Sequence, residues 1–124
     1  MRYFERQSSA TDKQNQSLIV RLERLLNNHL SERSAKRSIP TVAWCANQLN
    51  LSPNYFGDLV KRQTGRSAQE YIQRRIIDEA KMLLTSGKFS VSEVAYRLGF
   101  KYPHHLTRMF KRLESCTPNR YRRV

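Results

Sequence analysis

The chain has 124 residues, a length that suits one domain or two very small ones and argues against a large substrate cavity. Lysine and arginine number 23 and aspartate and glutamate 10, so the formal net charge is +13. Such an excess of one sign attracts polyanions, which makes nucleic acid the leading candidate partner and an anionic membrane surface the second. The excess is concentrated in residues 53–124, with 15 basic and 6 acidic side chains, against 8 and 4 in residues 1–52.

Cysteine usage and hydropathy narrow the class of protein further. Cys45 and Cys116 are the two cysteines, and neither belongs to a C-x-x-C pair, so we expect no zinc site and no disulfide framework, and a reducing cytoplasm. His104 and His105 are adjacent and do not share a helix face, so we expect no metal and no cofactor. No apolar run approaches the ~20 residues that cross a bilayer, and residues 1–6 do not form the apolar core that is typical of a signal peptide.

The predicted elements are all helices, because glycine and proline number four each and the alternation typical of strands is absent. Residues 1–16 are polar and aperiodic, and we expect a tail or linker there. Leucines between positions 18 and 30 recur at the i, i+4, i+7, i+8 spacing of an amphipathic helix. Residues 33–40 are predicted to be a polar loop that ends at a proline.

The remaining six helices are predicted from their capping residues, which gives seven in all. Serine or threonine stands where five of these helices begin, with a glutamate three positions later in two cases, the pattern of a capping box. Proline directly follows two of the caps, at the first helical position, and glycine ends two of the helices. The caps are Thr41, Ser52, Ser67, Ser90 and Thr117. A further helix follows the turn at Gly99-Phe100 and runs to about Leu113.

An internal repeat organises these helices. Residues 41–49 match residues 90–98 at an offset of 49, and residues 61–71 match residues 111–121 at an offset of 50. Each copy is a short helix, a three- or four-residue turn and a second helix, the spacing of a helix-turn-helix whose second helix enters the major groove. We therefore expect an all-α fold with a first subdomain over 17–86, including a long joining helix, and a second over 87–124. An ordinary helical hairpin would have the same spacing.

The second helix of each copy separates an apolar side from a polar side. Phe56, Leu59 and Val60 are predicted to pack inward, as are Leu106, Met109 and Phe110 in the second copy. The opposite side presents residues at i, i+3, i+4 and i+7, which can reach base edges, although a solvated polar face has the same pattern. The candidate base-contacting residues are Asn54, Gly57, Asp58, Lys61, His104, Thr107, Arg108 and Lys111.

A second set of residues is predicted to meet phosphates. Basic side chains and the backbone N–H groups of capped helix N-termini are the usual donors to phosphate oxygens. The candidates are Ser52, Arg62, Ser67, Ser90, Lys101, Arg112, Thr117, Arg120 and Arg122. Lys61 and Lys111, named above among the base-contacting candidates, and Arg123 are also expected to suit phosphates.

Two stretches of the sequence, one in each copy of the repeat, resemble the two halves of one family signature. The first is Leu51-Ser-Pro-Asn-Tyr-Phe, followed by Thr64-Gly65 and Tyr71-Ile72. The second is Val91-Ser-Glu-Val-Ala-Tyr, followed by Leu98-Gly99-Phe100 and Thr117-Pro118. Over residues 41–123 the sequence thereby resembles the C-terminal DNA-binding domain of AraC/XylS-type transcription regulators. The resemblance implies a bacterial regulator that binds double-stranded DNA, has RNA polymerase as a partner, and carries an upstream effector or dimerisation domain outside this chain.

Two departures from the family pattern and three competing functions accompany this prediction. Ser115 stands where glycine is common, and Gly57 and Asp58 stand where longer polar or basic side chains are common.

An enzyme fragment of the DNA-alkylation-repair kind is the first competing function. It would need a reactive cysteine, and the sequence settings of Cys45 and Cys116 do not suit one. A helical module that binds an acidic protein is the second competing function. RNA binding is the third, although a helix-turn-helix suits B-form grooves better.

Overall fold

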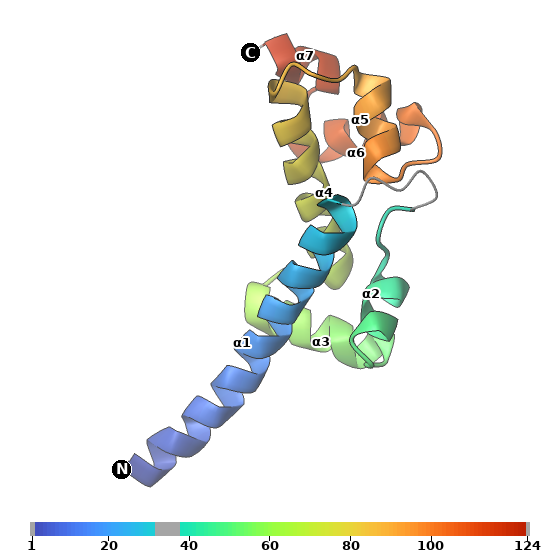
Figure 1. Cartoon of the computed structure of the whole chain (residues 1–124). Helices are drawn as coiled ribbons and strands as arrows, with labels where there is room; N and C mark the ends of the chain where they lie inside the picture. The colour runs from blue at the N-terminus through green and yellow to red at the C-terminus, as the bar shows by residue number, and fades with distance from the viewer. Residues whose placement is uncertain (1, 32–37, 124) are drawn as a thin grey trace.

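The computed structural model of the chain describes residues 2–31 and 38–123, with side chains described from residue 17 onward. All regular structure in these residues is helical, as the sequence predicts, and α4 joins two helix-turn-helix units (Figure 1). The helices are α1 (Arg2–Ser31), α2 (Val42–Gln48), α3 (Pro53–Thr64), α4 (Ala68–Thr85), α5 (Val91–Leu98), α6 (Pro103–Glu114) and α7 (Pro118–Arg123).

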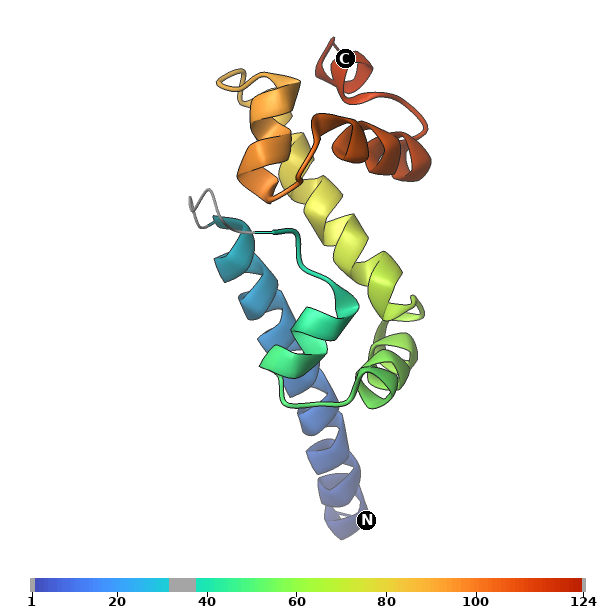
Figure 2. The same ribbon diagram turned by 90° about the vertical axis from the view of Figure 1, so that its right-hand side faces the viewer.

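The start of the first helix differs from the prediction. We expected a tail or linker over residues 1–16, but α1 begins at Arg2 and its N-terminal half extends beyond the other helices (Figures 1 and 2). No proline or glycine interrupts residues 2–31, so nothing in the backbone blocks the helix from continuing upstream of the leucine stripe. Of the predicted loop 33–40, positions 33–37 lie outside the described residues, and 38–40 are non-helical.

The predicted caps are in place. The side chains of Thr41, Ser52 and Ser67 each accept a hydrogen bond from the backbone N–H three residues later. Ser90 and Glu93 form a complete capping box, since Glu93 N donates to Ser90 Oγ at 3.1 Å and Ser90 N donates to Glu93 Oε1 at 2.8 Å. The starts of these four helices are therefore set by local side-chain chemistry.

The two helix-turn-helix units repeat the same backbone contact. Leu51 N donates to Ala46 O at 2.9 Å, and Phe100 N donates to Ala95 O at 3.0 Å. Both alanines are fully buried, which allows the first helix of each unit to pack closely against its neighbours. The structural repeat thus confirms the offset of 49 at the turn, and the extra residue of the second copy falls after Phe100.

Helix α4 is the common core element. Its apolar side chains are buried in one cluster that includes residues of α1, α2, α3, α5 and α6. Leu22 and Leu26 of α1 are fully buried in it, as are Phe56 of α3 and Phe110 of α6. Each subdomain therefore buries its core against the same helix, which removes the freedom that a flexible linker would leave between them.

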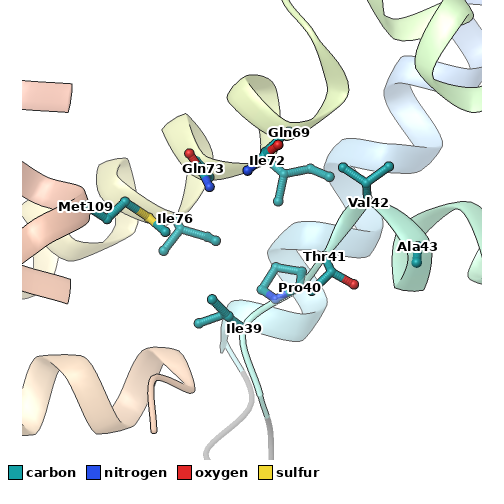
Figure 3. Close-up of a pocket in the computed structure, with 10 residues that line it drawn as sticks. All are labelled: Ile39, Pro40, Thr41, Val42, Ala43, Gln69, Ile72, Gln73, Ile76 and Met109. Carbon is teal, nitrogen blue, oxygen red and sulfur yellow. The ribbon is translucent and has the colours of Figure 1, made fainter. Parts of the chain in front are cut away.

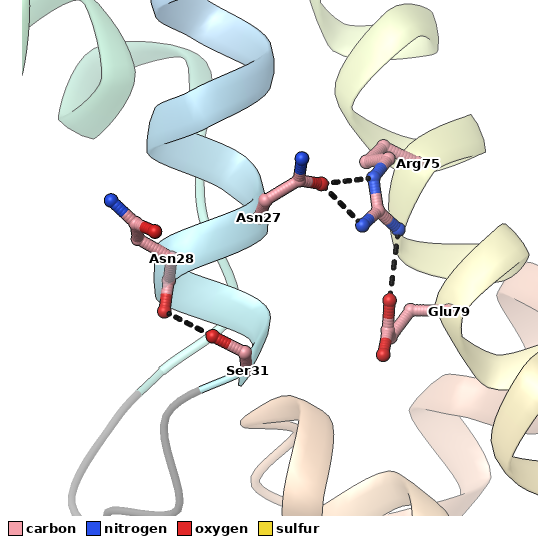
Figure 4. A network of polar contacts seen from close by, with 5 residues as sticks. All are labelled: Asn27, Asn28, Ser31, Arg75 and Glu79. Atoms are coloured by element: carbon pink, nitrogen blue, oxygen red, sulfur yellow. Dashed lines mark hydrogen bonds and ion pairs between the residues drawn. The ribbon is translucent and has the colours of Figure 1, made fainter.

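Polar contacts attach α1 to α4 (Figure 4). Arg75 donates from Nε and from one guanidinium nitrogen to Asn27 Oδ1, at 3.1 and 2.5 Å, and pairs with Glu79 at 3.1 Å. The Tyr71 hydroxyl donates to Glu23 of α1. Burial, together with this hydrogen bond, raises the pKa of Tyr71 well above its ordinary value. These bonds fix the register of α1 along α4.

A second group of contacts holds α6 and α7 on α4. Glu114 pairs with Arg74 at 3.3 Å and with Lys81 at 2.8 Å, so one carboxylate at the end of α6 holds two cations of α4. Tyr121 of α7 packs edge-on against Phe110, with 5.4 Å between ring centroids. The second subdomain is thereby joined to α4 by both charge and aromatic packing.

Ser115 occupies the left-handed region at the end of α6, with φ at 66°. That conformation costs a non-glycine residue about 1–2 kcal/mol, while glycine loses roughly 0.5–1 kcal/mol more backbone entropy on folding. We expect Ser115→Gly to raise the free energy of unfolding by about 0.5–1 kcal/mol, measured by urea denaturation. Ser86→Gly is the control, because Ser86 has a right-handed φ of −66°. This substitution should not raise the free energy of unfolding. An equal gain from both substitutions would contradict the account.

The Ser90 backbone N–H and hydroxyl hydrogen-bond to Glu93 and lower the pKa of its carboxyl below its ordinary value of 4.5. A depressed folded-state pKa stabilises the protein above the unfolded-state pKa, and the benefit is lost as the pH falls through the folded value. We expect Ser90→Ala to raise the Glu93 pKa toward 4.5, measured by carboxyl NMR titration. Ser92→Ala, in the same turn, should leave it unchanged.

Candidate nucleic-acid interface

The two faces of α3 are separated as the sequence predicts. Phe56 and Val60 are fully buried, and Leu59 is 8% exposed. On the other side Asn54, Asp58 and Lys61 are exposed, and Gly57 is half-buried. The helix therefore offers one polar stripe to solvent, with a gap in its middle where Gly57 has no side chain.

Helix α6 repeats the arrangement. Leu106 and Phe110 are fully buried and Met109 is half-buried. His104, Arg108 and Lys111 are exposed, whereas Thr107 is half-buried and its hydroxyl lies 3.5 Å from the Pro103 carbonyl oxygen. The stripe of α6 carries two cations, while that of α3 carries one cation and one carboxylate. The polar stripe of α6 is thus more electropositive than that of α3.

An aromatic cluster at the start of α6 was not predicted from the sequence. Tyr102 is 47% exposed, stacks on His104 at 5.7 Å between centroids with planes 14° apart, and meets His105 edge-on at 5.6 Å. The Lys101 ammonium lies 5.6 Å from the centre of the Tyr102 ring. Pro103 stands in the first turn of α6. Because the N-terminal residues of a recognition helix contact base edges, this proline is the sequence signal that could have identified residues 101–105 as part of the interface.

The predicted phosphate ligands differ in availability. Arg62, Lys101 and Arg120 are exposed. Arg112 is also exposed, and its guanidinium donates a hydrogen bond to Gln73 Oε1 of α4 at 2.5 Å. The four capping hydroxyls at the predicted sites all accept hydrogen bonds from their own helices, so phosphates there would meet the backbone N–H groups. These capping residues are Ser52, Ser67, Ser90 and Thr117.

Arg122 is less available to a phosphate than the other predicted basic ligands. Its guanidinium donates to the Leu84 carbonyl oxygen at 3.3 Å and to the Phe89 carbonyl oxygen, and it is half-buried. The end of α4 and the approach to α5 present carbonyl groups that lack helical partners, and a guanidinium satisfies them well. Arg122 thus ties α7 to the two ends of the loop between α4 and α5.

The two helix-turn-helix units lie at opposite ends of α4. Figures 1 and 2 show α2 and α3 near its N-terminal end and α5 and α6 along its C-terminal half. The basic residues after position 100 lie mainly on α6 and α7, next to the second unit. The geometry thus presents two polar helix faces on one rigid support.

The surroundings of Cys45 are unsuited to a reactive cysteine. Its side chain is fully buried in the core, and desolvation raises the pKa of its thiol to about 12. A thiol that accepts an alkyl group acts as a thiolate, which burial among apolar residues disfavours. Within the described residues, no three histidine, cysteine or acidic side chains are grouped to hold a metal, and no helix has the length and hydropathy to span a membrane.

Comparison with known proteins gives matches in both sequence and structure. A family model described as a helix-turn-helix domain matches residues 45–124. The HTH-type transcriptional activator RhaS of Escherichia coli (strain K12 / DH10B) is 31% identical over 114 residues, which cover 82% of this chain and 40% of RhaS. The C-terminal domain of AraT, a response regulator from Geobacillus stearothermophilus, superposes with a TM-score of 0.72 at 27% identity, over 86% of this chain and 84% of that one.

The chain belongs to the AraC/XylS family. A further match, to the DNA-binding domain of the global transcriptional factor AdpA, shows the same fold, with a TM-score of 0.67 at 24% identity over 88% of this chain and 89% of that one. The AraC/XylS-type chain described here spans from a tenth to two fifths of the length of the first curated relatives it matches.

The difference in burial between the two cysteines gives a prediction. Cys116 is half-buried at the end of the second unit, whereas Cys45 is fully buried and its thiol has a raised pKa. We expect one cysteine of the native protein to react with a thiol reagent at pH 8, and peptide mapping to place the label on Cys116. Cys45 should react only in denaturant. Labelling of Cys45 in the native state at a rate similar to Cys116 would contradict the burial argument.

Proposed function

We propose that this chain binds double-stranded DNA at specific sequences, as the DNA-binding part of a bacterial transcription regulator. In this proposal α3 and α6 enter two successive major-groove segments, about one helical turn or ~34 Å apart. The observation that carries the proposal is the matched pair of exposed polar faces, each backed by a buried apolar side and mounted on the same helix.

The charge of the chain supports the same function. The net charge of +13 gives long-range attraction to a duplex, and the exposed cations near α6 and α7 supply contacts to its backbone. If six or more phosphates are neutralised, log K against log salt should have a slope of about −5 or steeper. The DNA-binding domain of AdpA, which shares the fold, has a crystal structure in complex with a target DNA.

The base contacts follow from the exposed residues of each stripe. Asn54 can bond adenine bidentately, Arg108 can bond guanine, and Asp58 can accept from the cytosine amino group. The Asp58 carboxylate repels phosphate, so it serves the first unit only where a cytosine amino group faces it. Because α6 carries more cations, we assign it the larger share of the affinity.

The finer parts of the function are proposals from family membership. We expect the full-length protein to act in the cytoplasm, to contact RNA polymerase, and to place an effector or dimerisation domain before α1. The activator RhaS is similar to this chain over 114 residues, which is consistent with a role in transcription activation.

The decisive experiment is selection of bound sites from random duplex DNA, followed by affinity measurement on the selected site and on random duplex. We expect the selected site to bind at least tens of times more tightly at physiological salt, because specific readers exceed their non-specific affinity by large factors. A ratio below about tenfold would count against site-specific binding. If the chain binds an acidic protein and duplex DNA does not displace that protein, the result would favour a protein-interaction module instead.

Arg108→Ala should cost about 1–3 kcal/mol of binding free energy and relax the preference at one base position. The guanidinium is exposed in the middle of the α6 stripe, where a bidentate contact to guanine is available. Fluorescence anisotropy on the selected site and on its single-base variants gives both quantities. Arg108→Lys keeps the charge but loses the planar fork, and should relax the same position. Equal losses on every sequence would refute a base-reading role.

Lys111→Ala should weaken binding by a similar factor on all sequences and reduce the salt slope by about one unit. Lys111 stands one turn beyond the centre of the α6 stripe and is exposed, as a phosphate contact requires. The measurement is the affinity over a range of salt concentrations on the selected site and on random duplex. Lys88→Ala removes the same charge from the loop before α5, outside both stripes, and should change the slope less.

A further inference from the structure

Gly99 makes a backbone contact between the two subdomains. It ends α5 in the left-handed region, with φ at 104°, and faces the peptide that joins Ser38 to Ile39. A methyl group on its α-carbon would lie 2.7 Å from the Ser38 carbonyl carbon and 2.8 Å from Ile39 N. Real side chains do not approach backbone so closely, so only glycine lets the second unit sit against this peptide.

The other left-handed glycines show that this closeness is special to Gly99. Gly65 and Gly87 have φ values of 78° and 73°, and a methyl group on either would meet nothing within 4 Å. They need glycine for backbone conformation alone. Gly99 needs it for conformation and for the approach of another segment.

The peptide that meets Gly99 is anchored on the first subdomain. His29 Nε2 of α1 donates to the Ser38 carbonyl oxygen at 2.5 Å, and the His29 ring packs on Trp44 of α2 with 4.5 Å between centroids. Ile39 packs against the core and Pro40 is buried. The Ser38 peptide thus contacts both His29 and Gly99.

Beside this contact the subdomains are less closely packed. A cavity of about 310 Å³ opens between Ile39 and Pro40 of the first unit, Ile72 and Ile76 of α4, and Met109 of α6 (Figure 3). The space means that side-chain packing does not fill the junction, so the backbone contact limits how closely the two units approach.

We propose that the contact of Gly99 with Ser38 and Ile39 sets the distance and angle between the two reading units, and so determines which half-site spacing the chain accepts. This inference rests on the proposed function. Adding one base pair moves a half-site by roughly 3.4 Å and rotates it by about a tenth of a turn. A junction that shifts by a few ångströms is therefore enough to change the preferred spacing.

The test compares Gly99→Ala with Gly65→Ala and Gly87→Ala in the whole chain. All three place alanine at positive φ, but only Gly99→Ala also meets backbone. Affinity is measured on the selected site and on versions with one base pair added or removed between the half-sites. We expect the two controls to keep the spacing preference, and Gly99→Ala to lose about tenfold or more on the original spacing while a shifted spacing gains relative to it.

A second measurement needs no DNA. Residual dipolar couplings of backbone amides report the relative orientation of the two subdomains in the free protein. We expect this orientation to change in Gly99→Ala and to stay the same in the two controls. An unchanged orientation would overturn the inference whether or not the chain binds DNA, whereas a changed orientation in a chain without site-specific binding would overturn only the proposed function.

A third variant loosens the contact without adding a clash. His29→Ala removes the donor to the Ser38 carbonyl oxygen, and we expect the penalty for one added base pair to fall several-fold. His29→Gln keeps an N–H donor and should restore much of the penalty. If Gly99→Ala fails to fold, equal spacing preferences in wild type and in His29→Ala would still contradict the proposal.

Discussion

The burial of one helix by two subdomains is the constraint on which the rest of the structure depends. Ile76, Ile77, Ala80 and Leu84 of α4 are fully buried, and the cluster they belong to takes in side chains from both helix-turn-helix units. Each unit buries its apolar side chains in a cluster shared with α4. The shared core holds α3 and α6 on one support, and in our proposal the backbone contact at Gly99 sets the final distance and angle between them.

Much of the fold follows from local chemistry and could be predicted. Capping hydroxyls at Thr41, Ser52, Ser67 and Ser90 act within three residues, so their position in the sequence is enough to place the helix starts. The inward and outward faces of α3 and α6 were also predictable, because a helix of known phase has only one apolar side.

The features that escaped prediction depend on contacts between distant segments. Arg122 has the charge expected of a phosphate ligand, but its guanidinium donates to carbonyl groups of residues that lie 33 and 38 positions earlier. Gly99 is an ordinary turn glycine in the sequence, and its second role exists only because the peptide at Ser38 reaches it. The upstream half of α1 lacks an apolar stripe, so periodicity gave no sign of the helix that continues there. Which of the exposed residues touch bases is not fixed by the fold and stays a prediction.

The one-residue insertion after Phe100 makes the two units unequal. The first reading helix begins with a serine cap, while the second begins at Tyr102 with no side-chain cap and carries a ring cluster in its place. A chain with two different heads cannot lie on a duplex equivalently in both directions. Under the proposed function, its binding site is therefore asymmetric rather than palindromic, and a single bound molecule points one way along the promoter.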